Sequence, residues 1–591
     1  MPAMKPARYS GGPCMKFILL AMSLLHSIAF CALTAKMVLP NTYYAEDVFR
    51  DYHVIQRTSE THAGLSLKGT YAGGLPAHIQ IKLIDQEDTS CVQGYNWTSI
   101  ESAISGGQWT GSTLIPVGGE YKILFRSIDA SETELEVSDT AEHVLVGDIW
   151  AASGQSNMCG RGDLVDVEPS IPYVHHMIDM YRRDGCWQVA AEPIASTTHG
   201  LILRFAKEVY YTTGIPIGLI ASASGGQSIT YWDKAQTSYS YGYAPLLRTI
   251  DAAGGIIKGM IWYQGESDTD SLRSCLYKER TVAFFNNVRG DVENPQLPIV
   301  LAQIGGETAY GDGRWWMHTR NEQRLIAEED SNAACVSVFD LPRKDNVHLS
   351  TPGYKIAGVR FARAALKLAY AMDTLTWGGP RFDKAFFIDD NNDKIVVVFS
   401  GVRDSLQPSD TIKGLFVLDS LGGALVRSAI SGISLYGPNS VLIFLESSAS
   451  ANALVGYGDG FDPIKDSVNL TDGTGIPAQL FYYEPIAESG TVKSEDIVRL
   501  RGNIDPEPVL TAQPNPFNPR TRIMVRNIGL REQCQGMVYS VTGTVVWQFS
   551  AIGSQLLEGI VWDAGSLPSG IYLVKASVWN KTISKRIIYL K

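Results

Sequence analysis

Positive charge is scarce in this sequence, and no long run of lysine and arginine occurs in it. Charged residues make up 19% of the 591 residues, and the formal net charge is -11 at pH 7. Nucleic acids and anionic membrane surfaces are bound mainly through clusters of lysine and arginine. The composition therefore argues against both as partners and favours a neutral ligand such as a sugar.

Cysteine is also scarce, and no two cysteines form a CxxC pair. Of the 8 cysteines in the chain, those beyond the first 35 residues are widely spaced. A zinc site or a redox motif would need closely spaced pairs, so we expect neither a metal nor a cofactor. Disulfides formed after export and buried thiols are both compatible with this spacing. The six cysteines in question are Cys91, Cys159, Cys186, Cys275, Cys335 and Cys534.

Long apolar runs are lacking except for one near the start of the chain. Met15 and Lys16 precede an apolar stretch over residues 17–33, and small residues follow as far as Ala35. This order is typical of a signal peptide, whereas a membrane anchor needs about 18 to 20 uninterrupted apolar residues. We expect residues 1–35 to be a signal peptide with an upstream extension. The mature chain would then have no membrane span and would be secreted or held on a bacterial cell surface after export through the periplasm.

The length predicts several domains, because a domain usually has about 100 to 150 residues. Short alternating runs separated by glycine-rich turns predict a small β domain over residues 36–145. Between residues 146 and 372, apolar strands alternate with helical stretches at 201–211 and 351–372. That alternation predicts a parallel sheet covered by helices on both faces.

The rest of the chain returns to a strand-like pattern. Residues 373–486 predict a second β domain, and residues 487–510 form a short charged linker. Prolines in the segment 513–519 (QPNPFNP) forbid helix and regular strand pairing, so they mark a boundary. Residues 511–591 predict a last β domain. The expected fold is therefore an α/β domain flanked by β domains.

The first candidate for chemistry is Ser156. Residues 146–158 (VGDIWAASGQSNM) predict a strand that runs into a small polar turn. Ligands of open parallel sheets bind beyond the carboxyl ends of the strands, where the hydroxyl of Ser156 would lie. A lone serine in such a turn is more often a helix cap, so catalysis requires partners from elsewhere in the chain.

Those partners are predicted at Asp345 and His348, just before the helical stretch 351–372. A nucleophilic serine needs a base to take its proton, and the base needs a carboxylate to fix its tautomer and stabilise the imidazolium. Because Asp345 and His348 lie three residues apart on one short loop, both can converge on Ser156.

Donors for an oxyanion are predicted at two further strand ends. The Gly225–Gly226 pair follows the strand 215–223, and Gln264 follows the strand that begins at residue 259. Acyl transfer requires backbone N–H groups or a side-chain amide aimed at the developing negative charge. A plain strand-to-helix turn is the alternative reading of the glycine pair.

These segments together resemble the SGNH hydrolase superfamily, and most closely its sialate O-acetylesterases and the acetylxylan esterases of carbohydrate esterase family 6. Residues 154–158 (GQSNM) match the nucleophile block, and Gly225–Gly226 with Trp232 match the glycine block. Residues 262–266 (WYQGE) match the third block, with glutamine in place of asparagine, and residues 345–348 match the final DxxH block.

The resemblance implies a three-layer, flavodoxin-like hydrolase domain between β-sandwich domains, and a carbohydrate O-acetylesterase that acts on an acetylated carbohydrate. An acetylxylan esterase and a catalytically inactive carbohydrate-binding protein are the alternatives. The implied catalytic residues are Ser156, His348 and Asp345, and the oxyanion donors are Ser156, Gly226 and Gln264. The residues implied in substrate binding are Gln155, Asn157, Trp232, Trp262, Glu266 and Arg320.

Separately, the tail from Pro514 to Lys591 resembles the C-terminal sorting domains of type IX secretion, which have a FlgD-like immunoglobulin fold. Residues 538–543 (VYSVTG) and 570–574 (GIYLV) carry the likeness. The resemblance implies the secretion machinery as a partner, and it says nothing about the substrate.

Overall fold

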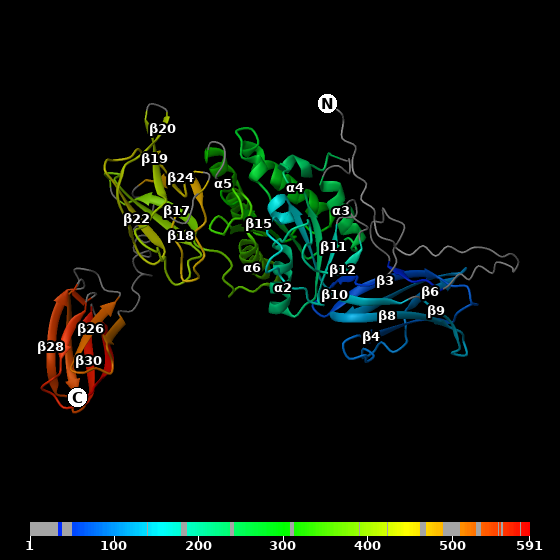
Figure 1. Ribbon diagram of the computed structural model, residues 1–591, viewed down its shortest axis with the longest axis horizontal. Helices are drawn as coiled ribbons and strands as arrows, with labels where there is room; N and C mark the ends of the chain where they lie inside the picture. Colours follow the sequence, from blue (N-terminus) through cyan, green and yellow to red (C-terminus); the bar gives the residue numbers. More distant parts are fainter. Residues whose placement is uncertain are drawn as a thin grey trace.

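The computed structural model describes residues 33–37 and 50–591, except for 139, 179–185, 237–241, 308–312, 389, 422–423, 461, 463–467, 489–508, 527–532, 553–554, 557–558 and 579–580. Most of the predicted signal peptide and most of the predicted linker lie outside these residues. An α/β region lies between two β regions, and a further β region ends the chain (Figure 1). No helix in the described ranges is long and apolar enough to cross a membrane.

The first β region has two sheets that share one core. One sheet has the order β1-β3-β7-β6, and the other is built on β4 and β8, which pair along their full length. In β4, Ile79, Ile81 and Leu83 are buried while their neighbours are not, as expected for a strand with one face on the core. The strands are β1 (Lys36–Met37), β2 (Val54–Gln56), β3 (His62–Thr70), β4 (His78–Asp85), β5 (Thr98–Ser99), β6 (Glu101–Ser105), β7 (Gln108–Pro116), β8 (Gly118–Ile128) and β9 (Glu134–Val137).

The α/β region is built on a sheet with the order β12-β11-β13-β10-β14-β15-β16, parallel except for β12 at one edge. Each of β13 to β16 is buried along its whole length, because helices cover both faces. The strands are β10 (Ala141–Gly154), β11 (Val174–Ile178), β12 (Trp187–Val189), β13 (Ile217–Ala223), β14 (Gly259–Tyr263), β15 (Ile299–Gln303) and β16 (Ala333–Ser337).

Alternate side chains of the sheet enter two separate cores. Trp150 and Ala152 of β10 belong to the core that includes α2 (Ile202–Thr213) and α6 (Thr351–Tyr370). Ile149 and Ala151 belong to the core that includes α3 (Tyr243–Ala252) and α4 (Tyr277–Asp291). The helix α5 (Gly313–Glu329) contacts α4 and the edge strand β16. The region is therefore a three-layer α/β structure.

Strand β10 joins the first β region to the α/β region. It pairs with β8 near its start and with β13 and β14 toward its end, so the expected boundary between residues 145 and 146 falls inside one strand. At the junction the buried carboxylate of Asp148 accepts hydrogen bonds from Arg57 Nε at 2.8 Å and from Gln56 Nε2 at 3.1 Å. This buried ion pair links the two regions.

Two β regions follow the α/β region. The first is an eight-stranded sheet, β20-β19-β23-β24-β17-β18-β22-β21, and the last comprises the sheets β25-β26-β29 and β28-β27-β30-β31. Cys91, Cys275, Cys335 and Cys534 take part in no disulfide within the described part of the chain. The strands are β17 (Arg381–Phe387), β18 (Lys394–Ser400), β19 (Leu415–Leu421), β20 (Ala424–Arg427), β21 (Ile430–Leu435), β22 (Ser440–Leu445), β23 (Leu454–Tyr457), β24 (Phe481–Ala487), β25 (Val509–Gln513), β26 (Arg520–Arg526), β27 (Gln533–Ser540), β28 (Val545–Ile552), β29 (Ile560–Asp563), β30 (Gly570–Val578) and β31 (Lys581–Tyr589).

Candidate active site

Ser156 is the first residue of the short helix α1 (Ser156–Cys159), at the carboxyl end of the central strand β10. The strand ends at Gly154, whose φ is +139° and where a Cβ would lie 2.2 Å from the carbonyl oxygen of Tyr263. Only glycine fits there, and the sharp turn that it allows brings Ser156 out of the sheet. The serine therefore lies at the edge of the parallel sheet where ligands bind.

The loop before α6 brings His348 to this serine. Nε2 of His348 is 2.9 Å from Oγ of Ser156, and Nδ1 is 2.8 Å from Oδ2 of Asp345. The other oxygen of Asp345 accepts hydrogen bonds from the backbone N–H groups of Val347 and His348. Partial burial opposes ionisation of Asp345, but these hydrogen bonds outweigh it and lower the pKa of the carboxyl. Asp345 is therefore held as a carboxylate facing the imidazole.

Asn157 forms hydrogen bonds between the turn that carries Ser156 and the loop that carries His348. Its amide donates to Glu266 Oε1 at 2.6 Å and to the carbonyl of Val347 at 3.3 Å. Its carbonyl oxygen accepts from Leu349 N at 3.2 Å and from the hydroxyl of Tyr354 at 2.8 Å. The side chain is 1% exposed and its polar atoms are hydrogen-bonded within the protein, so the predicted contact of Asn157 with substrate stays a prediction. It is a positioning residue.

Two glycines follow β13 beside the serine. A Cβ placed on Gly225 would lie 3.6 Å from Cβ of Ser156, whereas Gly226 is exposed and has φ +73°. Among the described residues neither glycine donates its N–H to a backbone carbonyl. Neither N–H is thus committed to a described backbone carbonyl, and Gly225 is the glycine that lies against Ser156.

Gln264 does not join these donors, contrary to the prediction. It is fully buried, and its amide nitrogen donates to the carbonyl of Gln227 at 3.1 Å and to the carboxylate of Asp268. Gln155 is also buried, and its Oε1 faces the N–H groups of Gly265 and Ser267, each at 3.3 Å. Both glutamines hold neighbouring strand ends together, and the predicted substrate contact of Gln155 stays a prediction.

Three further predicted substrate contacts lie inside the protein. Trp232 and Trp262 are 1% and 0% exposed and pack edge to face with their ring centres 4.9 Å apart. Arg320 of α5 is 0% exposed and donates to the backbone carbonyls of Ile304 and Gly460 at 3.1 and 3.0 Å. The tryptophans form core and the arginine holds loops together, so the three side chains are buried within the protein, and their predicted contacts with a sugar stay predictions.

Glu266 lies between the site and the core. Burial raises the pKa of its carboxyl to about 7, and the hydrogen bond from Asn157 opposes that rise. Because Oε1 accepts from Asn157 at 2.6 Å, Glu266 supports the nucleophile turn rather than the imidazole. Asp345 is the carboxylate that contacts His348.

The β region after α6 also contacts the loop that carries His348. Arg343 Nη2 lies 2.7 Å from Oδ2 of Asp462, and Arg343 Nη1 donates to the carbonyl of Asn346 at 3.2 Å. The side chains of Arg343 and Asp462 are 18% and 14% exposed. This largely buried ion pair links the β region to the backbone between Asp345 and His348.

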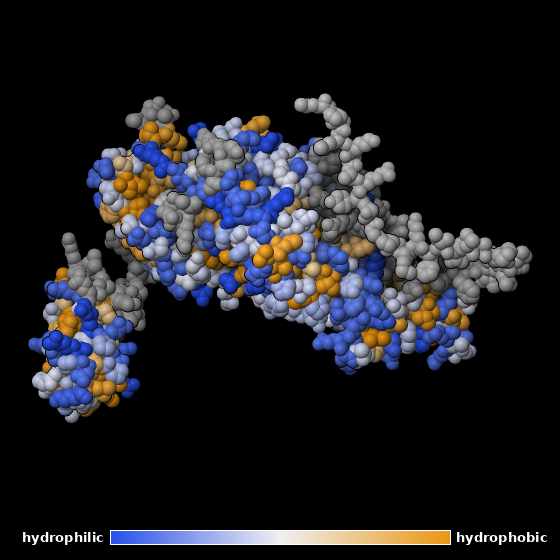
Figure 2. Space-filling view, viewed as in Figure 1, coloured by the Kyte–Doolittle hydropathy of each residue, from blue (hydrophilic) through white to orange (hydrophobic). Residues whose placement is uncertain are grey.

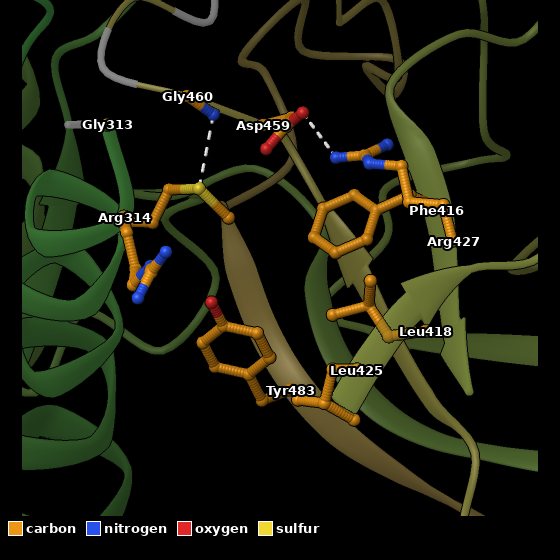
Figure 3. A pocket seen from close by; sticks show the side chains of 10 residues that line it. Gly313, Arg314, Phe416, Leu418, Leu425, Arg427, Asp459, Gly460 and Tyr483 are labelled. Atoms are coloured by element: carbon orange, nitrogen blue, oxygen red, sulfur yellow. Dashed lines mark hydrogen bonds and ion pairs between the residues drawn. The ribbon is translucent and has the colours of Figure 1, made fainter. Parts of the chain in front are cut away.

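A separate hollow of about 600 Å³ lies between α5 and the β region. Arg314 and Tyr483 line one side, and Phe416 lines another with Arg427 stacked over its ring (Figure 3). Hydrophobic side chains gather at the β19–β20 end of this region (Figure 2), where Leu425 is 53% exposed. The hollow is not lined by Ser156, His348 or Asp345.

One residue beside the serine was not predicted. A Cβ placed on Gly225 would lie 2.8 Å from Nη2 of Arg161, so the guanidinium borders the glycine that also borders Ser156. Arg161 is exposed, and its only signal in the sequence is that it follows Ser156 by five residues. The recurring blocks of the sequence pattern do not reveal which way such a side chain points.

Comparisons with known proteins find carbohydrate esterases. The model of a family described as carbohydrate esterase, sialic acid-specific acetylesterase, matches residues 146–367. A protein of Arabidopsis thaliana named a probable carbohydrate esterase is 30% identical over 243 residues, which are 37% of this chain and 90% of the relative. Human sialate O-acetylesterase is 24% identical over 330 residues, covering 45% of this chain and 61% of that protein.

A solved structure supports the same fold. The crystal structure of a carbohydrate acetylesterase from Xanthomonas citri matches 73% of this chain and 98% of its own, with a TM-score of 0.55 and 21% identity. The relatives are carbohydrate esterases, which indicates a hydrolase of acetyl esters. This chain belongs to the sialic acid-specific acetylesterase family of carbohydrate esterases.

Proposed function

We propose that this chain is a carbohydrate O-acetylesterase of the SGNH type, in which Ser156 is the nucleophile, His348 the base and Asp345 the orienting acid. The observation that carries the proposal is the continuous chain of hydrogen bonds from Ser156 Oγ through both nitrogens of His348 to Asp345, at 2.9 and 2.8 Å. With a proton on Nδ1 facing Asp345, the neutral imidazole offers Nε2 as the acceptor for the serine hydroxyl.

The reaction proceeds in two steps. Ser156 Oγ attacks the acetyl carbonyl carbon while its proton passes to Nε2 of His348. The bond between the acetyl carbon and the sugar oxygen then breaks, and His348 returns the proton to that oxygen. Water attacks the acetyl-serine with His348 as base, which releases acetate and restores the serine.

The negative oxygen of each tetrahedral intermediate is stabilised by backbone donors. Ser156 begins a helix, so its N–H has no partner within the helix, and the backbone of Gly225 lies beside the serine, where a Cβ on the glycine would be 3.6 Å from Cβ of Ser156. Gln264 is not assigned to this role, because its amide is buried and already hydrogen-bonded. The oxyanion site is therefore made of backbone alone.

The substrate is an acetylated sugar, with a sialic acid as the first candidate and acetylated xylan as the second. The family description and the human relative support the first. A catalytically inactive sugar-binding protein is disfavoured, because such a protein would have no need to keep a serine, an imidazole and a carboxylate in hydrogen-bonded line.

We further propose that the chain is exported and then secreted or kept at the cell surface. The apolar run after Lys16 and the tail from Pro514, which resembles type IX sorting domains, support this placement and suggest the secretion machinery as a partner. The flanking β regions would be β-sandwiches, and the last one immunoglobulin-like.

The test is acetate release from three esters: O-acetylated sialic acid, acetylated xylo-oligosaccharide and a long-chain fatty ester. The proposal expects turnover of at least one acetylated sugar and little of the fatty ester. Preference for the xylo-oligosaccharide would keep the mechanism and change the substrate. Turnover of none of the acetyl esters by the folded protein would refute the proposed function.

A further inference from the structure

Arg161 is placed at the nucleophile by a local chain reversal. Gly160 ends α1 with φ +90°, and a Cβ there would lie 2.5 Å from the carbonyl oxygen of His199. The chain must therefore turn at a glycine, and the next residue returns toward the strand ends. Its guanidinium borders Gly225 from one side while Ser156 borders the same glycine, as the distances of 2.8 and 3.6 Å from a Cβ placed there show.

A glycine at position 225 is what lets the arginine approach. Any side chain there would begin 2.8 Å from Nη2 of Arg161 and would displace the guanidinium. The backbone of the Gly225–Gly226 turn and the arginine therefore share one edge of the site. A cation and backbone donors together make that edge suitable for an anionic group.

The acidic groups nearby are committed to other partners. Asp345 faces His348, and Glu266 accepts a hydrogen bond from Asn157. In the same loop as the arginine, Asp163 pairs with Lys344. None of the described carboxylates pairs with Arg161, so no acidic side chain in the described part of the chain neutralises its charge.

We propose that Arg161 binds a carboxylate on the sugar that bears the acetyl ester, and so makes the site selective for acidic acetylated sugars over neutral ones. The inference rests on the proposed function. A guanidinium presents a planar fork of N–H donors that matches a carboxylate with two parallel hydrogen bonds, and it remains charged at every relevant pH. The negative oxygen that develops on the reacting ester is served by the backbone donors at Ser156, so it does not require this cation.

The experiment compares two forms of one substrate: an O-acetylated sialic acid and the same sugar with its carboxylate blocked as a methyl ester. Acetate release is measured for the full chain, for Arg161→Gln and for Arg161→Lys. The wild type should hydrolyse the free acid faster than the methyl ester. Arg161→Gln should lower kcat/KM for the free acid by about 10- to 100-fold, mainly by raising KM, because the variant loses hydrogen bonds to a charged carboxylate. The lysine variant should recover part of the loss.

The matched control is Lys355→Gln, which removes one positive charge near the same loop, where Lys355 pairs with Asp166 at 2.9 Å. It should leave the preference for the free acid unchanged. Equal loss on both substrates in Arg161→Gln would overturn the inference, because the guanidinium would then serve the reacting ester itself. A wild type that hydrolyses both forms equally would also overturn it while leaving the esterase function intact, and a wild type inactive on every acetyl ester would refute the function instead.

Discussion

Removing the side chain of Asn157 should uncouple the nucleophile turn from the loop that carries His348. Asn157→Ala deletes four hydrogen bonds at once: two strong ones, with Glu266 at 2.6 Å and with the Tyr354 hydroxyl at 2.8 Å, and two longer ones at 3.2 and 3.3 Å. Each buried hydrogen bond contributes about 0.5 to 1.5 kcal/mol, so the expected loss of unfolding free energy is about 3 kcal/mol. For a region of this size that corresponds to roughly 6 to 12 °C in the melting temperature.

The same change should reduce catalysis although it touches none of the three reacting groups. Val347 and Leu349 flank His348, so freeing their backbone lets the imidazole move away from Ser156. A displacement of about 1 Å costs on the order of 100-fold in rate, and we expect kcat to fall by about 10- to 100-fold with less change in KM.

The assay pairs thermal unfolding with steady-state acetate release. The control is Asn439→Ala, which removes a single hydrogen bond to the carbonyl of Phe399 in the following β region and should leave kcat unchanged. If Asn157→Ala keeps both the melting temperature and kcat of the wild type, the positioning role is refuted. A large change in KM alone would instead restore Asn157 as a substrate contact.

Three further changes test other parts of the site. His348→Ala should lower kcat for acetate release more than Asp345→Asn does, because the imidazole exchanges a proton in both steps whereas Asp345 only orients it. A larger loss of kcat in Asp345→Asn would contradict the assignment. Burial raises the pKa of Glu266 from 4.5 to about 7, so between these pH values the folded state retains a proton that the unfolded state loses. The free energy of unfolding of the wild type therefore falls as the pH rises from about 4.5 to 7. Glu266→Gln should therefore gain stability relative to the wild type across that range in denaturant titrations, and a pH-independent difference would argue against it. Asp462→Ala breaks the ion pair with Arg343 and should lower kcat by about 10-fold, and an unchanged kcat would show that the β region does not position the loop.

Much of the fold was predictable because hydrophobic patterning reports burial directly. The helices expected over residues 201–211 and 351–372 are confirmed as α2 and α6, and the α/β alternation is confirmed as a parallel sheet with two cores. The boundary between residues 145 and 146 was harder to predict, because β10 is buried without a break from Val144 to Gly154 and continues from one region into the next.

In the site, residue spacing could be used for prediction, whereas the direction in which a side chain points could not. Asp345 and His348 lie three residues apart on one loop, so their approach to Ser156 follows from the spacing. The direction of Trp262 does not follow, because every residue of β14 is buried and no alternation distinguishes the two faces. Arg161 was not predicted because it lies in a turn, where no periodic pattern indicates the direction of a side chain.

The central claim is that Ser156 carries the acetyl group during turnover. The most direct test is acetate release from an O-acetylated sugar by the wild type and by Ser156→Ala, with the melting temperature of each chain measured alongside. We expect Ser156→Ala to keep the melting temperature of the wild type and to lose on the order of 10³-fold or more in kcat, because the covalent route is gone while the fold is intact. Turnover by folded Ser156→Ala close to that of the wild type would contradict it.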